Sequence, residues 1–210
     1  MITLFEYKTA AREAADEFVE KRSRFIGYAK PVATDADAVA FVKQIRAKHP
    51  DATHNVYAYV VRENNIQRYS DDGEPAGTAG LPVLDVIRKE GLTDICVVAT
   101  RYFGGTLLGG GGLVRAYTHT AKIAVEAAGI LLRRFCFQYN VRIDYALLET
   151  VRREAEARGA IAGEATYTDR VELVYYIPYD VENFADVLTE ATNGRAVILK
   201  KDEGRFVDVI

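Results

Sequence analysis

Apolar and polar positions follow strand-like patterns in several segments of the first 130 residues. Residues 94–100 are almost wholly apolar, which is typical of a strand that is covered on both faces. Residues 54–62 are rich in β-branched and aromatic side chains, and Asn64-Asn65 predicts a hairpin turn from them into residues 66–69. The other strands expected here are an early one among the opening residues and an extended segment over 18–32.

Three further segments of this part have the features of helices. Thr34 is expected to begin the first helix, with Asp37 completing a capping box. Residues 81–90 predict a short helix, and residues from Leu113 to Gly129 predict a longer one with a clear apolar face. The apolar side of the first helix is expected to consist of Val39, Phe41, Val42 and Ile45.

Residues 131–210 follow a different order of elements. Two helical segments, which Asp144 and Asp180 are expected to cap, separate strand patterns over 134–143, 161–168, 171–178 and 196–210. The last strand is expected to break at Glu203-Gly204. The order β-α-β-β-α-β is that of a ferredoxin-like fold. We therefore expect an α+β protein of two domains, residues 1–130 and residues 131–210.

Ten of the sixteen glycines lie between residues 70 and 120, and four of them, Gly109, Gly110, Gly111 and Gly112, run directly into the longer helix. Free N–H groups at a helix start attract anions. Neither the P-loop pattern nor the Rossmann spacing is present, so no nucleotide class is specified. The alternative is that these glycines allow the helix to pack closely against residues 94–100.

Arg101, Tyr102 and Phe103 follow the apolar strand, at the end where α/β-type sheets often bind ligands. An arginine with two aromatic rings is suited to hold a phosphate and to stack a base. Alternatively, both rings belong to the core and Arg101 pairs with Asp71 or Asp72.

A second candidate is an acidic site formed by Asp71, Asp72 and Glu74 together with His54. Such carboxylates bind hard cations or act as general acids and bases. Equally, Asp in a loop with glycine and proline bonds to backbone N–H groups and forms a turn. The histidine spacing matches no zinc motif and neither serine lies in a nucleophile elbow, so we assign no catalytic residue, metal ligand or cofactor.

The net charge of −3 excludes a global basic field, so a nucleic-acid surface has to be a local patch. The basic run at Lys21 and Arg24 is one such patch. Cys96 and Cys136 lie in apolar surroundings, which fits buried thiols in a reducing compartment. With no apolar run long enough for a bilayer, we expect a cytoplasmic protein without membrane contact.

Several motifs together resemble the IMPACT family in its bacterial YigZ-like branch, over about residues 15–125. They are Lys21-x-Ser-Arg-Phe-Ile26, His54-Asn55, Tyr69-Ser-Asp-Asp-Gly-Glu-Pro-Ala-Gly-Thr-Ala-Gly80, Thr100-Arg-Tyr-Phe-Gly-Gly105, Leu108-Gly109 and Gly112-Leu-Val-Arg-Ala-Tyr117. The resemblance implies a first domain like those of a small-subunit ribosomal protein and RNase PH-type folds. It implies a ferredoxin-like second domain similar to one in elongation factor G. Both relatives touch RNA, and eukaryotic members of the family are linked to translational control.

Our leading hypothesis is a non-enzymatic, RNA- or ribosome-associated regulator of translation. Its expected contacts are Lys21, Arg24, Arg101 and Arg115, with Tyr102 or Phe103 stacking a base and Gly109–Gly112 binding phosphate. The rival hypothesis is a small hydrolase or nucleotide-processing enzyme that uses the acidic site with a divalent cation. A protein-binding adaptor that acts through the C-terminal sheet is a third alternative.

Overall fold

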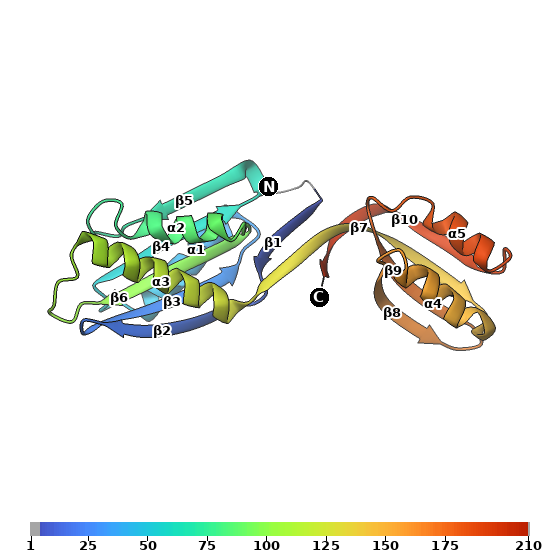
Figure 1. Ribbon diagram of the computed structural model, residues 1–210, viewed down its shortest axis with the longest axis horizontal. Helices are drawn as coiled ribbons and strands as arrows, with labels where there is room; N and C mark the ends of the chain where they lie inside the picture. The colour runs from blue at the N-terminus through green and yellow to red at the C-terminus, as the bar shows by residue number, and fades with distance from the viewer. Residues whose placement is uncertain (1–4, 210) are drawn as a thin grey trace. The chain divides into compact units, whose positions relative to one another are not determined.

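The computed structural model describes residues 5–209, which form two compact units (Figure 1). The first unit extends from Tyr7 to Leu131. The second begins at Leu132 and includes Phe5 and Glu6. The expected early strand is β1 (Glu6–Ala10). Among the described residues, no helix has both the length and the apolar character needed to cross a bilayer.

A five-stranded antiparallel sheet forms the middle layer of the first unit. Its order is β2 (Ala14–Glu20), β3 (Ser23–Pro31), β6 (Ile95–Tyr102), β4 (His54–Val61) and β5 (Ile66–Ser70). Strand β6 lies at the centre and is buried on both faces, as its apolar sequence predicts. The segment over 18–32 is not one extended piece but the hairpin β2–β3. It turns at Lys21 and Arg22, which both have positive φ.

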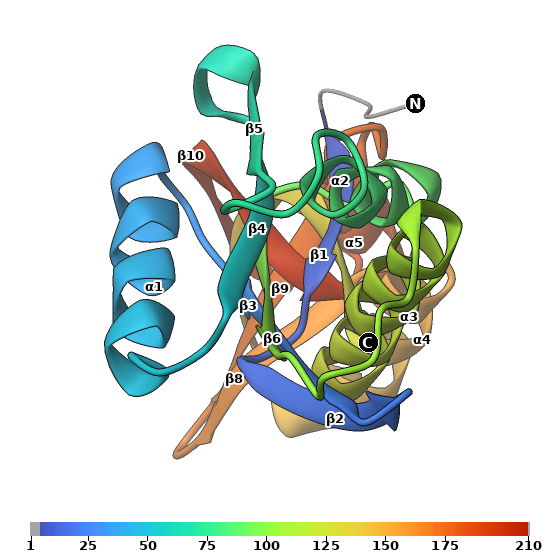
Figure 2. The ribbon, with the colours of Figure 1, turned by 90° about the vertical axis from the view of Figure 1, so that its left-hand side faces the viewer.

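Helices cover both faces of this sheet (Figure 2). Helix α1 (Asp35–Lys48) lies on one face, while α2 (Gly80–Lys89) and α3 (Gly110–Ala128) lie on the other. The capping box of Thr34 and Asp37 is confirmed. Val39, in contrast, is 37% exposed and does not belong to the apolar side of α1.

Helix α3 begins three residues before the predicted start at Leu113. Gly109 has a φ of 75° and serves as its N-cap, so Gly110, Gly111 and Gly112 form the first turn. Glycine has a low intrinsic helix propensity, and for that reason the sequence pattern places these residues in a loop. The helix packs against β3, and its first turn lies at the end of the sheet.

The second unit has the ferredoxin-like order of elements. Its strands are β7 (Ile130–Ile143), β8 (Ile161–Tyr167), β9 (Val171–Pro178) and β10 (Val197–Val209), and its helices are α4 (Leu148–Glu156) and α5 (Phe184–Ala191). In its sheet β7 pairs with β9 and with β10, β9 pairs with β8, and these three pairs are antiparallel. The two helices pack on the sheet through a separate apolar core.

Three predicted details of this unit have definite outcomes. Asp144 precedes a 3-10 turn (Tyr145–Leu147) rather than α4 and makes no side-chain cap. Asp180 is not the cap of α5 either, because Asn183 holds that position with a φ of 59°. The last strand does not break at Glu203-Gly204 but continues as β10, with a shift of register against β7 between Lys200 and Gly204.

Candidate functional site

Three segments of the first unit meet at one end of its sheet: the β2–β3 turn, the loop after β6 and the start of α3. Gly104 packs directly against the backbone of Arg22, and a Cβ at this glycine would overlap the Arg22 carbonyl group. The amide of Gly104 also donates to the hydroxyl of Ser23, at 3.2 Å. These contacts fix the basic turn at Lys21 and Arg22 beside the glycine-rich loop.

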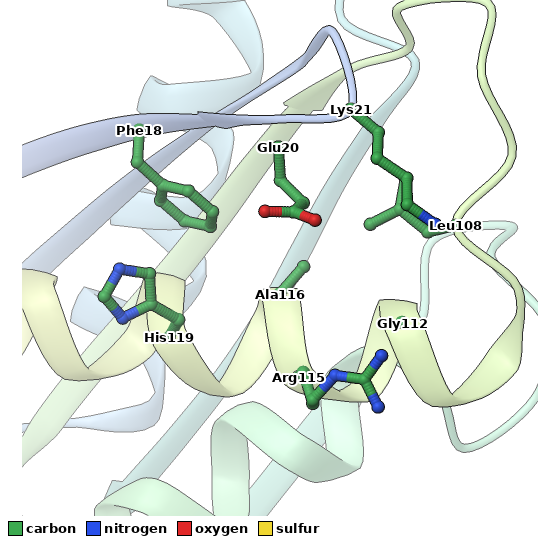
Figure 3. Close-up of a pocket in the computed structure, with 8 residues that line it drawn as sticks. All are labelled: Phe18, Glu20, Lys21, Leu108, Gly112, Arg115, Ala116 and His119. Atoms are coloured by element: carbon green, nitrogen blue, oxygen red, sulfur yellow. The ribbon is translucent and has the colours of Figure 1, made fainter.

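A groove of about 270 Å³ lies between this turn and α3 (Figure 3). We call it the α3 groove, and it is lined by Phe18, Glu20, Lys21, Leu108, Gly112, Arg115, Ala116 and His119. Lys21 and Arg115 are exposed, and neither has an ion-pair partner within residues 5–209. The Glu20 carboxylate points toward α3 in Figure 3 and opposes the two cations.

The start of α3 is open to this region. The first backbone bond of the helix runs from the Leu113 amide to the Gly109 carbonyl oxygen, at 2.9 Å, so the three amides of Gly110–Gly112 have no intrahelical acceptor. No acidic side chain occupies the first turn. Arg115 extends back toward it and comes within 3.8 Å of the place where a Cβ of Gly111 would lie. Amides, helix dipole and guanidinium therefore act on an anion in the same direction.

A second cavity, of about 410 Å³, lies on the other side of Leu108. We call it the Glu74 pocket. Arg101 and Glu74 form an ion pair in it, with Nη1 and Oε1 2.6 Å apart and side chains only 6% and 4% exposed. The Tyr117 hydroxyl donates to the same carboxylate oxygen at 2.7 Å. Burial, and then the Glu74 carboxylate, raise the pKa of Tyr117 far above that of a free tyrosine.

This geometry corrects the expected role of Arg101. Its guanidinium does not reach outward to bind a phosphate backbone, and it pairs with Glu74 rather than with Asp71 or Asp72. Its position in the central strand, buried on both faces, explains the difference, because only a carboxylate inside the fold can compensate the charge there. Phe103, by contrast, is 44% exposed and remains available to stack a base.

Asp71 and Asp72, in the loop before α2, make hydrogen bonds that stabilise the fold. The Asp71 carboxylate accepts hydrogen bonds from the amides of Gly77, Ala79 and Gly80, and so caps the start of α2. Asp72 accepts one from Arg46 at 2.5 Å and another from the Asn55 amide at 2.6 Å.

The carboxylates thus have separate protein partners. Across residues 5–209, no group of three or more His, Cys, Asp or Glu side chains is placed to hold a metal ion. The geometry does not favour the divalent-cation hypothesis.

The side chain of His54 lies next to that of Glu74. Its Nδ1 lies 2.7 Å from the backbone carbonyl oxygen of Asp72. A carbonyl oxygen only accepts, so Nδ1 carries the proton and Nε2 faces Glu74 at 3.8 Å. The ring therefore turns its Nε2 toward the Glu74 carboxylate.

Two of the predicted contact residues lie away from this end of α3. Side chains alternate along β3, and since Phe25 packs toward α2 and α3, Arg24 faces the α1 side, where it pairs with Glu17 at 2.6 Å. Tyr102 also packs on the α1 side, and its hydroxyl hydrogen-bonds to His49 at 2.8 Å. Of the predicted contact residues, the structure brings Lys21, Gly112 and Arg115 to the α3 groove and Arg101, Phe103, Gly109 and Gly110 to the Glu74 pocket.

Sequence reasoning missed several residues of these two cavities. The helical spacing after Leu113 predicts Tyr117 on the apolar face of α3, where a hydroxyl gives no separate signal. Glu20 and His119 stand at polar positions of a strand and a helix, and only the packing of β2 against α3 brings them to one groove.

Comparisons with known proteins extend over both units. Residues 21–125 match the Impact N-terminal domain, and residues 141–195 match a domain of unknown function (DUF1949). The IMPACT family member YvyE of Bacillus subtilis (strain 168) is 39% identical over 197 residues, which cover 93% of this chain and 91% of that protein. YigZ of Escherichia coli (strain K12) is 47% identical over 128 residues, 60% of this chain and 63% of its own length.

The chain is also similar in fold to the crystal structure of a hypothetical protein. It is 30% identical to this chain, with a TM-score of 0.61 over 96% of this chain and 100% of the other. Taken together, the two domain matches and the near full-length relative show that the chain belongs to the IMPACT family.

Proposed function

We propose that this protein is a non-enzymatic, RNA- or ribosome-associated regulator of translation that binds the phosphate backbone of single-stranded RNA at the α3 groove. The observation that carries the proposal is the pair of exposed cations, Lys21 and Arg115, beside the open start of α3. The chain as a whole is acidic, with a net charge of −3, so binding depends on this local patch.

The expected affinity is modest. A helix start contributes only ~0.3–1 kcal/mol to an anion at an exposed site. Two cations neutralise about two phosphates, each of which adds about −0.7 to the slope of log affinity against log salt for single strands. Glu20 repels phosphate in the same groove, which further limits the affinity.

The link to translation is supported by family membership. The family resemblance connects eukaryotic members with translational control and the two folds with RNA-binding proteins of the ribosome cycle. A similarity of fold does not by itself establish function, so the proposal depends on the residues of the groove.

Salt-dependent binding to single-stranded RNA tests the proposal. Fluorescence anisotropy with a labelled oligonucleotide should show a shallower salt slope, by about 1.4, in Lys21→Ala/Arg115→Ala than in the natural protein. The matched control is Arg24→Ala/Lys43→Ala, which removes the same charges on the α1 side and should leave the slope unchanged. If the salt slope becomes shallower by the same amount in both variants, the RNA does not bind at the α3 groove.

Two further results bear on the same proposal. Glu20→Gln removes the opposing carboxylate and should tighten RNA binding at low salt, while weaker or unchanged binding would contradict the groove geometry. Co-sedimentation should place the protein with ribosomes at low salt and release it as salt rises. A protein that binds neither RNA nor ribosomes at low salt refutes the proposed function.

A further inference from the structure

The α3 groove has two chemically different ends (Figure 3). One end carries the cations Lys21 and Arg115, beside the first turn of α3. The other end carries the rings of Phe18 and His119, whose centroids lie 4.6 Å apart at an interplanar angle of 65°. A groove with cations at one end and rings at the other is suited to a ligand that joins an anion to a flat group.

The two elements that form the groove place these groups in the same order. Along β2, Phe18 and Glu20 are two residues apart and share a face, and the strand then turns at Lys21. Along α3, His119 lies one turn further from the helix start than Arg115. Cation and ring are thus separated by about 10 Å along the strand and about 6 Å along the helix. A nucleotide has its phosphate and base in this order, with the ribose between them.

Glu20 lies between the two ends, and its carboxylate points toward α3 (Figure 3). Within the part of the chain that the structure describes, this carboxylate has neither an ion pair nor a hydrogen bond. An ionised carboxylate accepts hydrogen bonds and donates none, so it repels phosphate and can bind only a donor of the ligand. Inside an RNA strand, the 2′-hydroxyl of the ribose is the donor of the sugar–phosphate backbone.

We infer that Glu20 accepts a hydrogen bond from a ribose 2′-hydroxyl and that the α3 groove thereby distinguishes RNA from DNA. The phosphate lies at Lys21 and Arg115, and the base packs against His119 at the other end. This inference rests on the proposed function, because it assigns the sugar of the strand that the groove binds. The charge of Glu20 weakens the binding of every strand, whereas its hydrogen bond selects one kind of strand.

Oligonucleotides that differ only in their sugars test the inference on the natural protein. The probes are oligouridylate, its 2′-deoxy form and its 2′-fluoro form, which keeps the sugar pucker of RNA but has no hydroxyl donor. Oligouridylate should bind about tenfold more tightly than either of the others, as expected for one hydrogen bond to a charged acceptor. A 2′-fluoro strand that binds as tightly as RNA overturns the inference, because the sugar pucker then decides.

The same titrations separate this inference from the proposed function. If all three strands bind equally and with the expected salt slope, the groove binds phosphate and only the reading of the sugar is wrong. If none of them binds at low salt, the proposed function fails and the inference fails with it.

Glu20→Ala tests the residue itself. The ratio of the affinities for RNA and DNA should fall from about ten to nearly one, because phosphate repulsion is equal for both strands and cancels in the ratio. The matched control is Asp16→Ala, which removes a carboxylate from the same strand outside the groove and should keep the ratio. Both side chains are exposed, and circular dichroism confirms that the fold is kept. A ratio that persists in Glu20→Ala, or falls equally in Asp16→Ala, overturns the inference.

A variant at the other end of the groove checks the place of the base. His119→Ala should weaken the binding of oligouridylate about fivefold and leave the salt slope unchanged, because it removes a stacking ring and no phosphate contact. The matched control is Tyr69→Ala, which removes a ring that is 46% exposed, on β5 and outside the groove. Unchanged affinity or a shallower slope in His119→Ala would exclude this place for the base, and with it the ribose beside Glu20.

Discussion

The buried ion pair of Arg101 and Glu74 gives the most demanding test of the structure. Glu74→Gln leaves the guanidinium without its charged partner, and Arg101→Met leaves the carboxylate with the Tyr117 hydroxyl and with His54 Nε2, which is 3.8 Å away. With side chains 6% and 4% exposed, either change leaves an uncompensated buried charge, which costs about 3–5 kcal/mol of unfolding free energy.

The double variant Glu74→Gln/Arg101→Met should be far less destabilised than the sum of the two. Neither charge remains, the glutamine still accepts from the Tyr117 hydroxyl, and methionine adapts to the space along Phe25. A buried pair replaced by neutral groups is often close to neutral in stability. We therefore expect a cost of about 1–2 kcal/mol and a coupling of at least ~2 kcal/mol between the two positions.

Urea unfolding followed by circular dichroism measures all three free energies. The matched control is the pair Arg24 and Glu17, which is about half exposed on both sides and should cost no more than ~1 kcal/mol when broken. If Glu74→Gln and Arg101→Met each cost less than ~1 kcal/mol, as an exposed pair does, the buried geometry of this site is wrong.

Three further changes have clear expected outcomes. Gly27→Ala should destabilise by about 1–3 kcal/mol in urea unfolding, because a Cβ there would overlap the carbonyl oxygen of Thr120 in α3. Gly111→Ala, whose Cβ meets only the flexible end of Arg115, should stabilise by ~0.5–1 kcal/mol in the same measurement. Burial lowers the pKa of His49, so the unfolded chain binds a proton that the folded one does not. Stability should fall as the pH drops below about 6.5, less steeply in His49→Gln, and identical pH profiles for both proteins would contradict this assignment.

Local patterns predicted the fold well. The capping box at Thr34 and Asp37 needs only four residues, and the apolar run of β6 needs only seven, so neither depends on the rest of the chain. The order of elements in the second domain likewise follows from alternating strand and helix patterns. Where the prediction was wrong, as with Asp180, the cap was chosen from residue type alone, and the left-handed Asn183 took the position.

The site depended on contacts that no local pattern contains. Glu74 and Arg101 are 27 positions apart, and their pairing is fixed only when the loop before α2 folds over the end of β6. The alternation of side chains also separates neighbours: Arg101 faces the pocket, whereas Tyr102 faces α1. A cluster of arginine and aromatic residues in sequence was therefore divided between two faces of one sheet.

The double variant also separates two reasons for keeping a buried ion pair. If the pair serves stability alone, the neutral double variant should differ from the natural protein only in its free energy of unfolding. If the pair also holds the loop before α2 over the end of β6, Glu74→Gln/Arg101→Met should fold nearly as well and show faster amide hydrogen exchange in residues 71–80. A folded double variant that keeps the exchange rates of the natural protein in this loop would show that the ion pair has no part in positioning it.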